Sequence, residues 1–212
     1  MRPIGLFGGT FDPVHLGHLR SALEILECLD LAEMRFIPSA DPPHRPAPNL
    51  PADVRLKLLT LALKEQAGFA VETCELTRIG KSYTVDTLIE LRQRYGEQPL
   101  CLILGTDAFL GLPSWSRWQQ LTDFAHIVVA KRPGWHVPDD WEGMPWLGER
   151  MVQQPMLLHE QPSGRIYFQT VTPLDISATM IRSQLAAGRS IRYLVPDSVW
   201  QYIEAENKPD AK

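Results

Sequence analysis

Close to the N-terminus stands Gly5-Leu-Phe-Gly-Gly-Thr-Phe-Asp-Pro-Val-His-Leu-Gly-His18, which runs directly into an apolar segment of helical spacing. Residues 4–7 predict a short buried strand, and the leucines of residues 16–26 predict a helix. The glycine pair between them, Gly8 and Gly9, lets the backbone approach a ligand closely. Free backbone N–H groups and the positive end of the helix dipole meet at such a turn. It therefore predicts an anion site, usually one for phosphate.

Two histidines distinguish this turn from a generic strand-to-helix connection. His15 and His18 are three residues apart, so both lie on one face of the first helical turn. An imidazole near a phosphate can donate a hydrogen bond, or carry a proton that neutralises charge on the phosphate oxygens. This arrangement favours phosphoryl-type chemistry. Two alternatives stay open, a plain turn with surface histidines and a two-histidine metal site, although no Cys, Glu or further His close by completes a metal set.

The remaining apolar runs predict an α/β protein with a doubly wound parallel sheet. A helix at about residues 16–29 leads to a strand at 34–37, and this β-α-β unit implies parallel strands with a right-handed crossover. The other predicted strands are residues 69–72, 100–104, 126–130 and 166–171, and the other predicted helices are 53–66, one entered by the loop 82–88, 177–188 and 199–204. A length of 212 residues suits a single domain, residues 1–212, with a small helical part from about residue 177.

Composition and charge exclude several classes of protein. A net charge of -4 argues against broad nucleic-acid binding, which needs a basic face. There is no apolar run long enough for a membrane span, and the chain enters its first strand directly, so we expect a cytoplasmic protein. Three scattered cysteines, which we expect to be buried, suggest neither a disulfide framework nor a CxxC metal site. Anionic substrates must then be bound by a few local cations.

A second helix N-terminus is predicted within Ile176-Ser-Ala-Thr-Met-Ile-Arg182. Ser177 is a natural N-cap, Thr179 lies in the first turn, and Arg182 lies three residues beyond Thr179 on the same face. The start of this helix therefore carries hydroxyl groups and one fixed cation. A parallel sheet can bring it to the same edge as the glycine turn.

Both helix starts resemble motifs of a known superfamily. The segment Gly-Gly-Thr-Phe-Asp-Pro-Val-His-Leu-Gly-His resembles the first motif of the nucleotidyltransferases, and its form with two histidines is most similar to the bacterial nicotinate mononucleotide adenylyltransferases. The segment from Ile176 to Arg182 resembles their Ile-Ser-Ser/Thr-x-x-Arg motif, with Ala178 where the family often has Ser. The resemblance spans Gly8 to Arg182 and implies a Rossmann-like nucleotidyltransferase fold.

The resemblance also implies a set of functional residues. His15, His18 and Arg182 are the implied catalytic residues. The implied ATP-binding residues are Gly8, Gly9, Thr10, Phe11, His15, His18, Gly105, Asp107, Arg132, Ile176, Ser177, Thr179 and Arg182. Asp107 follows a predicted central strand, where a carboxylate suits a ribose hydroxyl or a hydrated cation.

A second set is implied for the mononucleotide, namely His44, Arg45, Tyr83, Thr84, Trp115 and Ser116. His44-Arg45 is similar to a phosphate-binding Pro-Pro-His-Lys segment, and Arg in place of Lys keeps the charge. The family resemblance implies that Tyr83 and Thr84 support the nicotinate carboxylate and that Trp115 stacks on the pyridine ring. Taken alone, the same residues also fit a proline-stiffened surface loop, an ordinary N-cap and core packing.

The implied reaction is adenylyl transfer from ATP, accompanied by Mg²⁺, to nicotinate mononucleotide. The products are nicotinate adenine dinucleotide and pyrophosphate, an enzymatic step of NAD biosynthesis. The rival enzymes are an adenylyltransferase for nicotinamide mononucleotide or phosphopantetheine and a cytidylyltransferase of the same superfamily; a further rival is a nucleotide-sensing module without turnover. The Trp-rich segment 135–164 suits a flap or a contact in a homo-oligomer.

Overall fold

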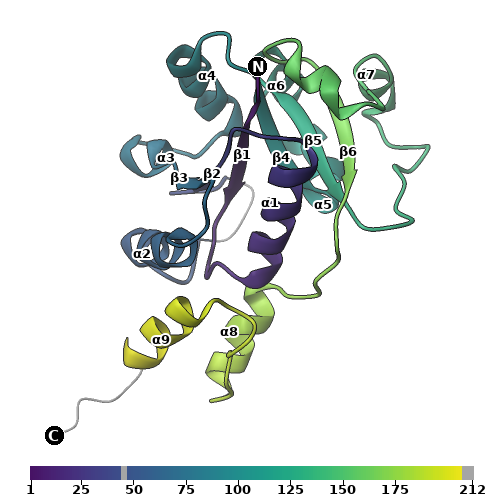
Figure 1. Cartoon of the computed structure of the whole chain (residues 1–212). Coiled ribbons are helices and arrows are strands. Elements are labelled where there is room, and N and C mark those ends of the chain that lie inside the picture. The colour runs from purple at the N-terminus through teal and green to yellow at the C-terminus, as the bar shows by residue number, and fades with distance from the viewer. Residues whose placement is uncertain (44–46, 207–212) are drawn as a thin grey trace, which may run out of the picture.

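The computed structural model describes residues 1–43 and 47–206 of the chain, and Figure 1 shows one sheet with helices on both faces. Within these residues the sheet has six strands in the order β3-β2-β1-β4-β5-β6, and all neighbouring strands are parallel. The strands are β1 (Ile4–Gly9), β2 (Glu33–Pro38), β3 (Phe69–Val71), β4 (Leu100–Gly105), β5 (His126–Lys131) and β6 (Ile166–Thr170). The predicted doubly wound parallel sheet is confirmed.

The centre of the sheet explains where a ligand can enter. The first five residues of β4 are all buried, as in a strand covered by helices on both faces. The strand order reverses between β1 and β4, which pair directly, with Ile4 opposite Leu100. The connections from these two strands leave in opposite directions, so a crevice opens beyond their carboxyl ends.

Helices of two groups cover the sheet. Those described are α1 (Leu16–Cys28), α2 (Ala52–Leu63), α3 (Cys74–Thr77), α4 (Thr84–Tyr95), α5 (Thr106–Leu110), α6 (Leu121–Phe124), α7 (Met144–Gly148), α8 (Ala178–Ala186) and α9 (Asp197–Glu206), with 3-10 turns η1 (Leu112–Ser114), η2 (Trp118–Gln120) and η3 (Pro155–His159). One apolar cluster contains Ile25 of α1 and Leu59 of α2, and the other contains Leu88 of α4 and Phe109 of α5. Among the described helices, none is long and apolar enough to cross a membrane.

Several elements differ from the sequence prediction. Helix α3 is not predicted, because a single turn of four residues leaves no helical periodicity to detect. Helix α2 ends at Leu63, three residues before the predicted end, and β3 ends at Val71. Cys28 is exposed at the last residue of α1, which corrects the expectation that all three thiols are buried.

The Trp-rich segment 135–164 packs against the chain's own body. The ring of Trp141 lies 4.7 Å from that of Phe109 in α5, and its Nε1 donates a hydrogen bond to the Leu110 carbonyl oxygen at 3.0 Å. Trp146 of α7 packs edge-on against Trp118 of η2, with ring centroids 4.9 Å apart. These contacts stabilise α5 and the turns after it. A flap and an oligomer contact stay predictions for this segment.

Candidate active site

A cavity of about 650 Å³ lies where β1 and β4 end. Loops that follow β1, β2, β4 and β5 supply its walls, as expected at the point where the strand order reverses. Most sequence-predicted site residues line this one cavity: Gly8, Gly9, Thr10, His15, His18, Tyr83, Thr84, Gly105, Asp107, Trp115, Ser116, Arg132 and Ile176. Residues up to 168 positions apart in the sequence therefore meet around a single ligand-sized space.

Some predicted site residues lie elsewhere. The side chain of Phe11 is 1% exposed, packs against His18 and Phe36, and does not line the cavity. Three residues at the start of α8, Ser177, Thr179 and Arg182, do not line the cavity wall itself. His44 and Arg45 lie outside the described residues, so their predicted role stays a prediction.

The two histidines form a stacked pair at the start of α1. His15 is the N-cap residue, and its ring centroid lies 3.6 Å from that of His18, with an angle of 23° between the planes. The backbone N–H of His15 donates to Nδ1 of His18 at 3.3 Å. Burial lowers the pKa of His15 to about 4, because a charged imidazole would lose its hydration there. At neutral pH His15 is therefore a neutral hydrogen-bonding group.

Asp12, which the sequence analysis did not single out, joins three distant segments. Its side chain is almost fully buried and accepts hydrogen bonds from the backbone N–H groups of Asn49 at 2.7 Å and Leu50 at 3.0 Å. Its backbone carbonyl oxygen accepts a 2.7 Å hydrogen bond from Nη1 of Arg182, which also pairs with the Asp12 carboxylate at 3.5 Å. The buried Arg55 donates to the Thr10 carbonyl oxygen at 2.7 Å. These contacts fix the β1–α1 turn relative to α8.

The start of α8 has the predicted geometry. The Oγ of Ser177 accepts a hydrogen bond from the backbone N–H of Met180 at 3.2 Å, which confirms the predicted N-cap. Nη2 of Arg182 donates to Oγ1 of Thr179 at 3.2 Å. The guanidinium is thus held between its own helix and Asp12, at the edge of the β1–α1 turn.

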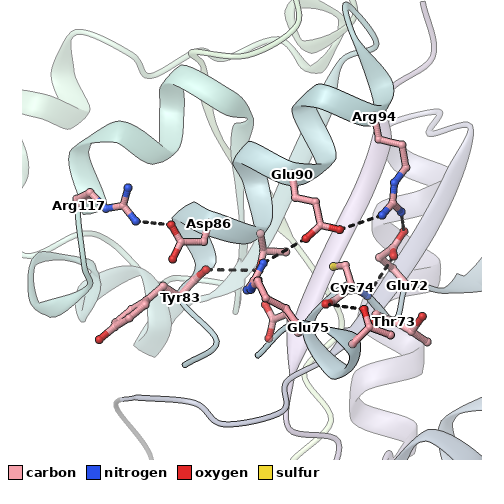
Figure 2. Close-up of polar contacts among 12 residues, drawn as sticks. Glu72, Thr73, Cys74, Glu75, Tyr83, Asp86, Glu90, Arg94 and Arg117 are labelled. Carbon is pink, nitrogen blue, oxygen red and sulfur yellow. Dashed lines mark hydrogen bonds and ion pairs between the residues drawn. The ribbon is translucent and has the colours of Figure 1, made fainter. Parts of the chain in front are cut away.

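Another part of the cavity wall is built from the start of α4 and from η1. Tyr83 is the N-cap residue of α4, and Thr84 is its first helical residue. Trp115 follows η1 and is half-buried at the cavity. Asp86 forms an ion pair with Arg117 and does not line the cavity (Figure 2).

The same part of the cavity wall contains Glu75, an acid that the sequence analysis missed. Glu75 of α3 is buried and lines the cavity, although it belongs to none of the predicted motifs. Burial raises the pKa of Glu75, while hydrogen bonds from Thr87 and Ser82 and the nearby Arg78 oppose that rise. Its neighbours on α3 and α4 give no local pattern that predicts a site, since the acid reaches the cavity only through the fold.

The described residues contain no group of three or more His, Cys, Asp or Glu side chains that could hold a metal ion. In the cavity wall, Asp107 is exposed at the start of α5, and Arg132 lies within 3.9 Å of Asp175. This donor set does not fit a metal bound by the protein alone. It fits a cation that arrives with phosphate ligands of its own and meets a single carboxylate.

Comparisons with known proteins identify the family of the chain. Residues 6–184 match the family model described as cytidylyltransferase-like. A relative named probable nicotinate-nucleotide adenylyltransferase from Methylococcus capsulatus is 50% identical over 96% of this chain and 98% of its own length. Another of that name, from Aeromonas hydrophila, is 48% identical over 96% of this chain and 95% of its own.

A solved structure shows the same fold at much lower sequence identity. Nicotinic acid mononucleotide adenylyltransferase from Plasmodium falciparum, complexed with NaAD, superimposes with a TM-score of 0.72 at 15% identity and covers 98% of this chain and 97% of that chain. The family match over residues 6–184 and the identity of about half over nearly the full length leave one assignment. The chain belongs to the cytidylyltransferase-like family, as a member of its nicotinate-nucleotide adenylyltransferase group.

Proposed function

We propose that this protein transfers the adenylyl group of ATP to nicotinate mononucleotide and releases nicotinate adenine dinucleotide and pyrophosphate. The observation that carries the proposal is the single cavity in which the His15 and His18 turn faces the wall of Tyr83 and Trp115. One side carries the groups that phosphates need, and the other carries donors and an aromatic ring that suit a pyridine carboxylate. The 50% identical relative bears the name of this activity. The cytoplasm stays the expected compartment.

The reaction requires no nucleophile from the protein. A 5′-phosphate oxygen of the mononucleotide attacks the α-phosphorus of ATP, the bond from that phosphorus to the α,β-bridging oxygen breaks, and pyrophosphate leaves with its electron pair. The attacking phosphate is already an anion at neutral pH. The protein must therefore align the two substrates and stabilise the charge that builds up on the phosphate oxygens.

This stabilisation comes from what we call the phosphate wall. It consists of the cavity-lining turn, residues 8–18, and of residues 177–182 behind that turn, which Arg182 joins to Asp12. The N-terminus of α1 borders the cavity at Gly17 and His18, so the positive end of its dipole lies beside the expected phosphates. His18 contacts the developing charge, and Arg182, held by Asp12, provides a fixed cation nearby. His15, neutral at pH 7, is a hydrogen-bond donor or acceptor to the triphosphate.

Mg²⁺ enters this proposal with ATP. When bound, the ion neutralises the phosphate oxygens and favours departure of pyrophosphate. Asp107, which lines the cavity, is the carboxylate that we expect to contact a hydrated cation or a ribose hydroxyl. Its role can be measured by the Mg²⁺ concentration that Asp107→Asn needs for half-maximal turnover.

The mononucleotide wall, defined as residues 39–41, 75–87 and 114–116, binds the pyridine nucleotide. Trp115 stacks on the ring, and the backbone N–H groups near Thr84 and Ser116 point to a carboxylate. Asp86 pairs with Arg117 and does not line the cavity, and Oε1 of Glu75 accepts from Thr87, so we assign neither acid to an amide NH₂. The mismatch should disfavour nicotinamide mononucleotide by about 1–3 kcal/mol, roughly 5- to 150-fold in kcat/KM.

The test is turnover with ATP and Mg²⁺ on three acceptors, nicotinate mononucleotide, nicotinamide mononucleotide and phosphopantetheine. We expect turnover of the acid, turnover of the amide that is weaker by about fivefold or more, and none of phosphopantetheine, which carries no ring for Trp115. Equal or better use of the amide would show that the pocket does not discriminate by donors. Absence of turnover with all three would favour a binding module. Light scattering of the same sample tests the predicted homo-oligomer.

A further inference from the structure

Glu75 is a buried acid that the proposed chemistry leaves without a task. It lies in the single-turn helix α3, between β3 and the start of α4, and its side chain reaches the cavity. The wall is proposed to bind the carboxylate of the substrate. A buried ionised acid in that wall costs free energy through desolvation and like-charge repulsion, so we expect Glu75 to have a compensating role. Figure 2 shows Glu75 beside Cys74, on the opposite side from Glu72.

The hydrogen bonds of Ser82 leave one direction for its proton. Its Oγ accepts from the backbone N–H groups of Ala40 at 3.1 Å and Asp41 at 3.3 Å. Since a hydroxyl oxygen has two lone pairs, both are then used, and the proton is left to donate. The Ser82 hydroxyl lies on the side of Glu75 and opposes the rise in the pKa of that carboxyl. Through the N–H groups of Ala40 and Asp41, Ser82 fixes the chain after β2 next to Glu75.

Thr87 repeats this arrangement on the first turns of α4. Its Oγ1 accepts a 2.8 Å hydrogen bond from Nη2 of Arg78 and donates to Oε1 of Glu75 at 2.8 Å. The competing contact of the same hydroxyl, to the Tyr83 carbonyl oxygen, is 3.4 Å long. Arg78 is in turn held by Glu90 at 3.4 Å. The carboxylate of Glu75 is therefore the acceptor that fixes the Thr87 hydroxyl.

We propose that Glu75 is a positioning residue for the mononucleotide wall, in which its carboxylate accepts the protons of Ser82 and Thr87 and so fixes residues 39–41 and the start of α4 around the pyridine nucleotide. This inference rests on the proposed function of that wall. Glu75 acts through Ser82, Thr87 and the backbone at Tyr83 and does not itself bind substrate. Its removal should therefore weaken binding of the mononucleotide and leave the phosphate wall intact.

The chemistry of a carboxylate, and not only its size, is required. Two hydroxyl groups whose protons both need an acceptor can be satisfied by the two oxygens of Glu75. A glutamine of the same shape has one acceptor oxygen and an NH₂ group, so one of the two hydroxyls would face a donor. Glu75→Gln should therefore release either Ser82 or Thr87 and loosen one half of the wall.

Glu72 provides a matched control. It is equally buried, lies three residues before Glu75, and is also engaged on both oxygens, by Arg94 at 2.7 Å and by the backbone N–H of Cys74 at 3.2 Å. It does not line the cavity. Figure 2 shows its ion pair with Arg94, on the side away from Tyr83. Glu72→Gln should lower the stability of the fold and leave the KM values of both substrates unchanged.

The experiment measures KM for each substrate, kcat and the urea midpoint of unfolding for wild type, Glu75→Gln, Ser82→Ala and Glu72→Gln. We expect Glu75→Gln to raise KM for nicotinate mononucleotide about tenfold, with KM for ATP unchanged within about twofold. Ser82→Ala should give the same pattern with a smaller rise, and it decides the matter should Glu75→Gln not fold. Unchanged KM values, or an equal rise for both substrates, would overturn the inference. Wild type that does not adenylate the mononucleotide would instead refute the proposed function.

Discussion

The phosphate wall is held by buried charged groups that bond to backbone, whereas the mononucleotide wall is held by hydroxyl groups around one acid. The Asp12 carboxylate accepts hydrogen bonds from the backbone N–H groups of Asn49 and Leu50, and Arg55 donates to the Thr10 carbonyl oxygen. In the mononucleotide wall, Glu75 accepts a hydrogen bond from the Thr87 hydroxyl, and we propose that it also accepts from Ser82. Backbone contacts fix positions whatever the neighbouring side chains are, and side-chain contacts fix a particular set of groups. The first wall therefore suits chemistry on phosphates, and the second suits the choice of acceptor.

The largest effect on turnover is expected from the phosphate wall. His18→Ala removes a ring that lies at the cavity and whose contact should strengthen as charge moves to pyrophosphate. We expect kcat to fall about 100-fold or more with small changes in KM, by analogy with loss of an oxyanion donor. Steady-state kinetics on both substrates measures it. His136→Ala, at an exposed histidine outside the cavity, is the control. Near-normal kcat in His18→Ala would remove His18 from the mechanism.

Acidification should lower the stability of the fold through two buried histidines, one in the phosphate wall and one in the sheet. Burial lowers the pKa of both His15 and His126 to about 4, below the ordinary value of 6.5. The unfolded chain then binds more protons than the folded one between pH 6.5 and 4, so stability falls as the pH drops through this window. From pH 7 to pH 5 each histidine should account for about 2 kcal/mol of lost unfolding free energy.

Two variants and one ligand test whether this loss of stability comes from His15 and His126. His126 is the buried first residue of β5, where Nδ1 accepts from the Arg165 backbone N–H at 3.0 Å and Nε2 donates to the Gln161 carbonyl oxygen at 2.9 Å. Urea unfolding of His126→Gln and His15→Gln at both pH values should each show about half of the wild-type loss. ATP should reduce only the share of His15, because phosphate stabilises a protonated ring. An equal loss in wild type and both variants would contradict the burial argument.

On the mononucleotide wall the expected effect is on binding. Trp115→Ala should raise KM for nicotinate mononucleotide about tenfold, because stacking of a base on an aromatic ring is worth about 1–3 kcal/mol. KM for ATP should stay nearly unchanged. Trp118→Ala is the matched control, since Trp118 packs on Trp146 and does not line the cavity. A rise in KM for ATP instead would place Trp115 on the other wall.

The sequence predicts those parts of both walls that leave a local pattern. The glycine turn, the two histidines and the Ser177 cap are each visible within one short segment, and the strands and long helices follow from periodicity. Asp12 and Glu75 are not visible in this way. Asp12 acts through Asn49 and Arg182, and Glu75 through Ser82 and Thr87, so their roles depend on contacts that only the folded chain creates.

The smallest effect tests the link between the first motif and α8. Arg182 uses Nη1 on the Asp12 carbonyl oxygen and Nη2 on Oγ1 of Thr179, so its guanidinium fork spans two partners. A lysine keeps the charge but carries one ammonium group on a flexible stem and cannot span both with the same geometry. Arg182→Lys should therefore retain the attraction for the triphosphate and lose its fixed position.

We expect Arg182→Lys to lower kcat about fivefold, equivalent to roughly 1 kcal/mol, with a smaller change in KM for ATP. Arg189→Lys, at an exposed position just after α8, provides the comparison and should behave as wild type. The defect should lie well short of that in His18→Ala, because the cation is still present and only its position is loosened. Full activity in Arg182→Lys would mean that charge alone suffices at this place. The contact with Asp12 would then hold α8 against the β1–α1 turn without contributing to turnover.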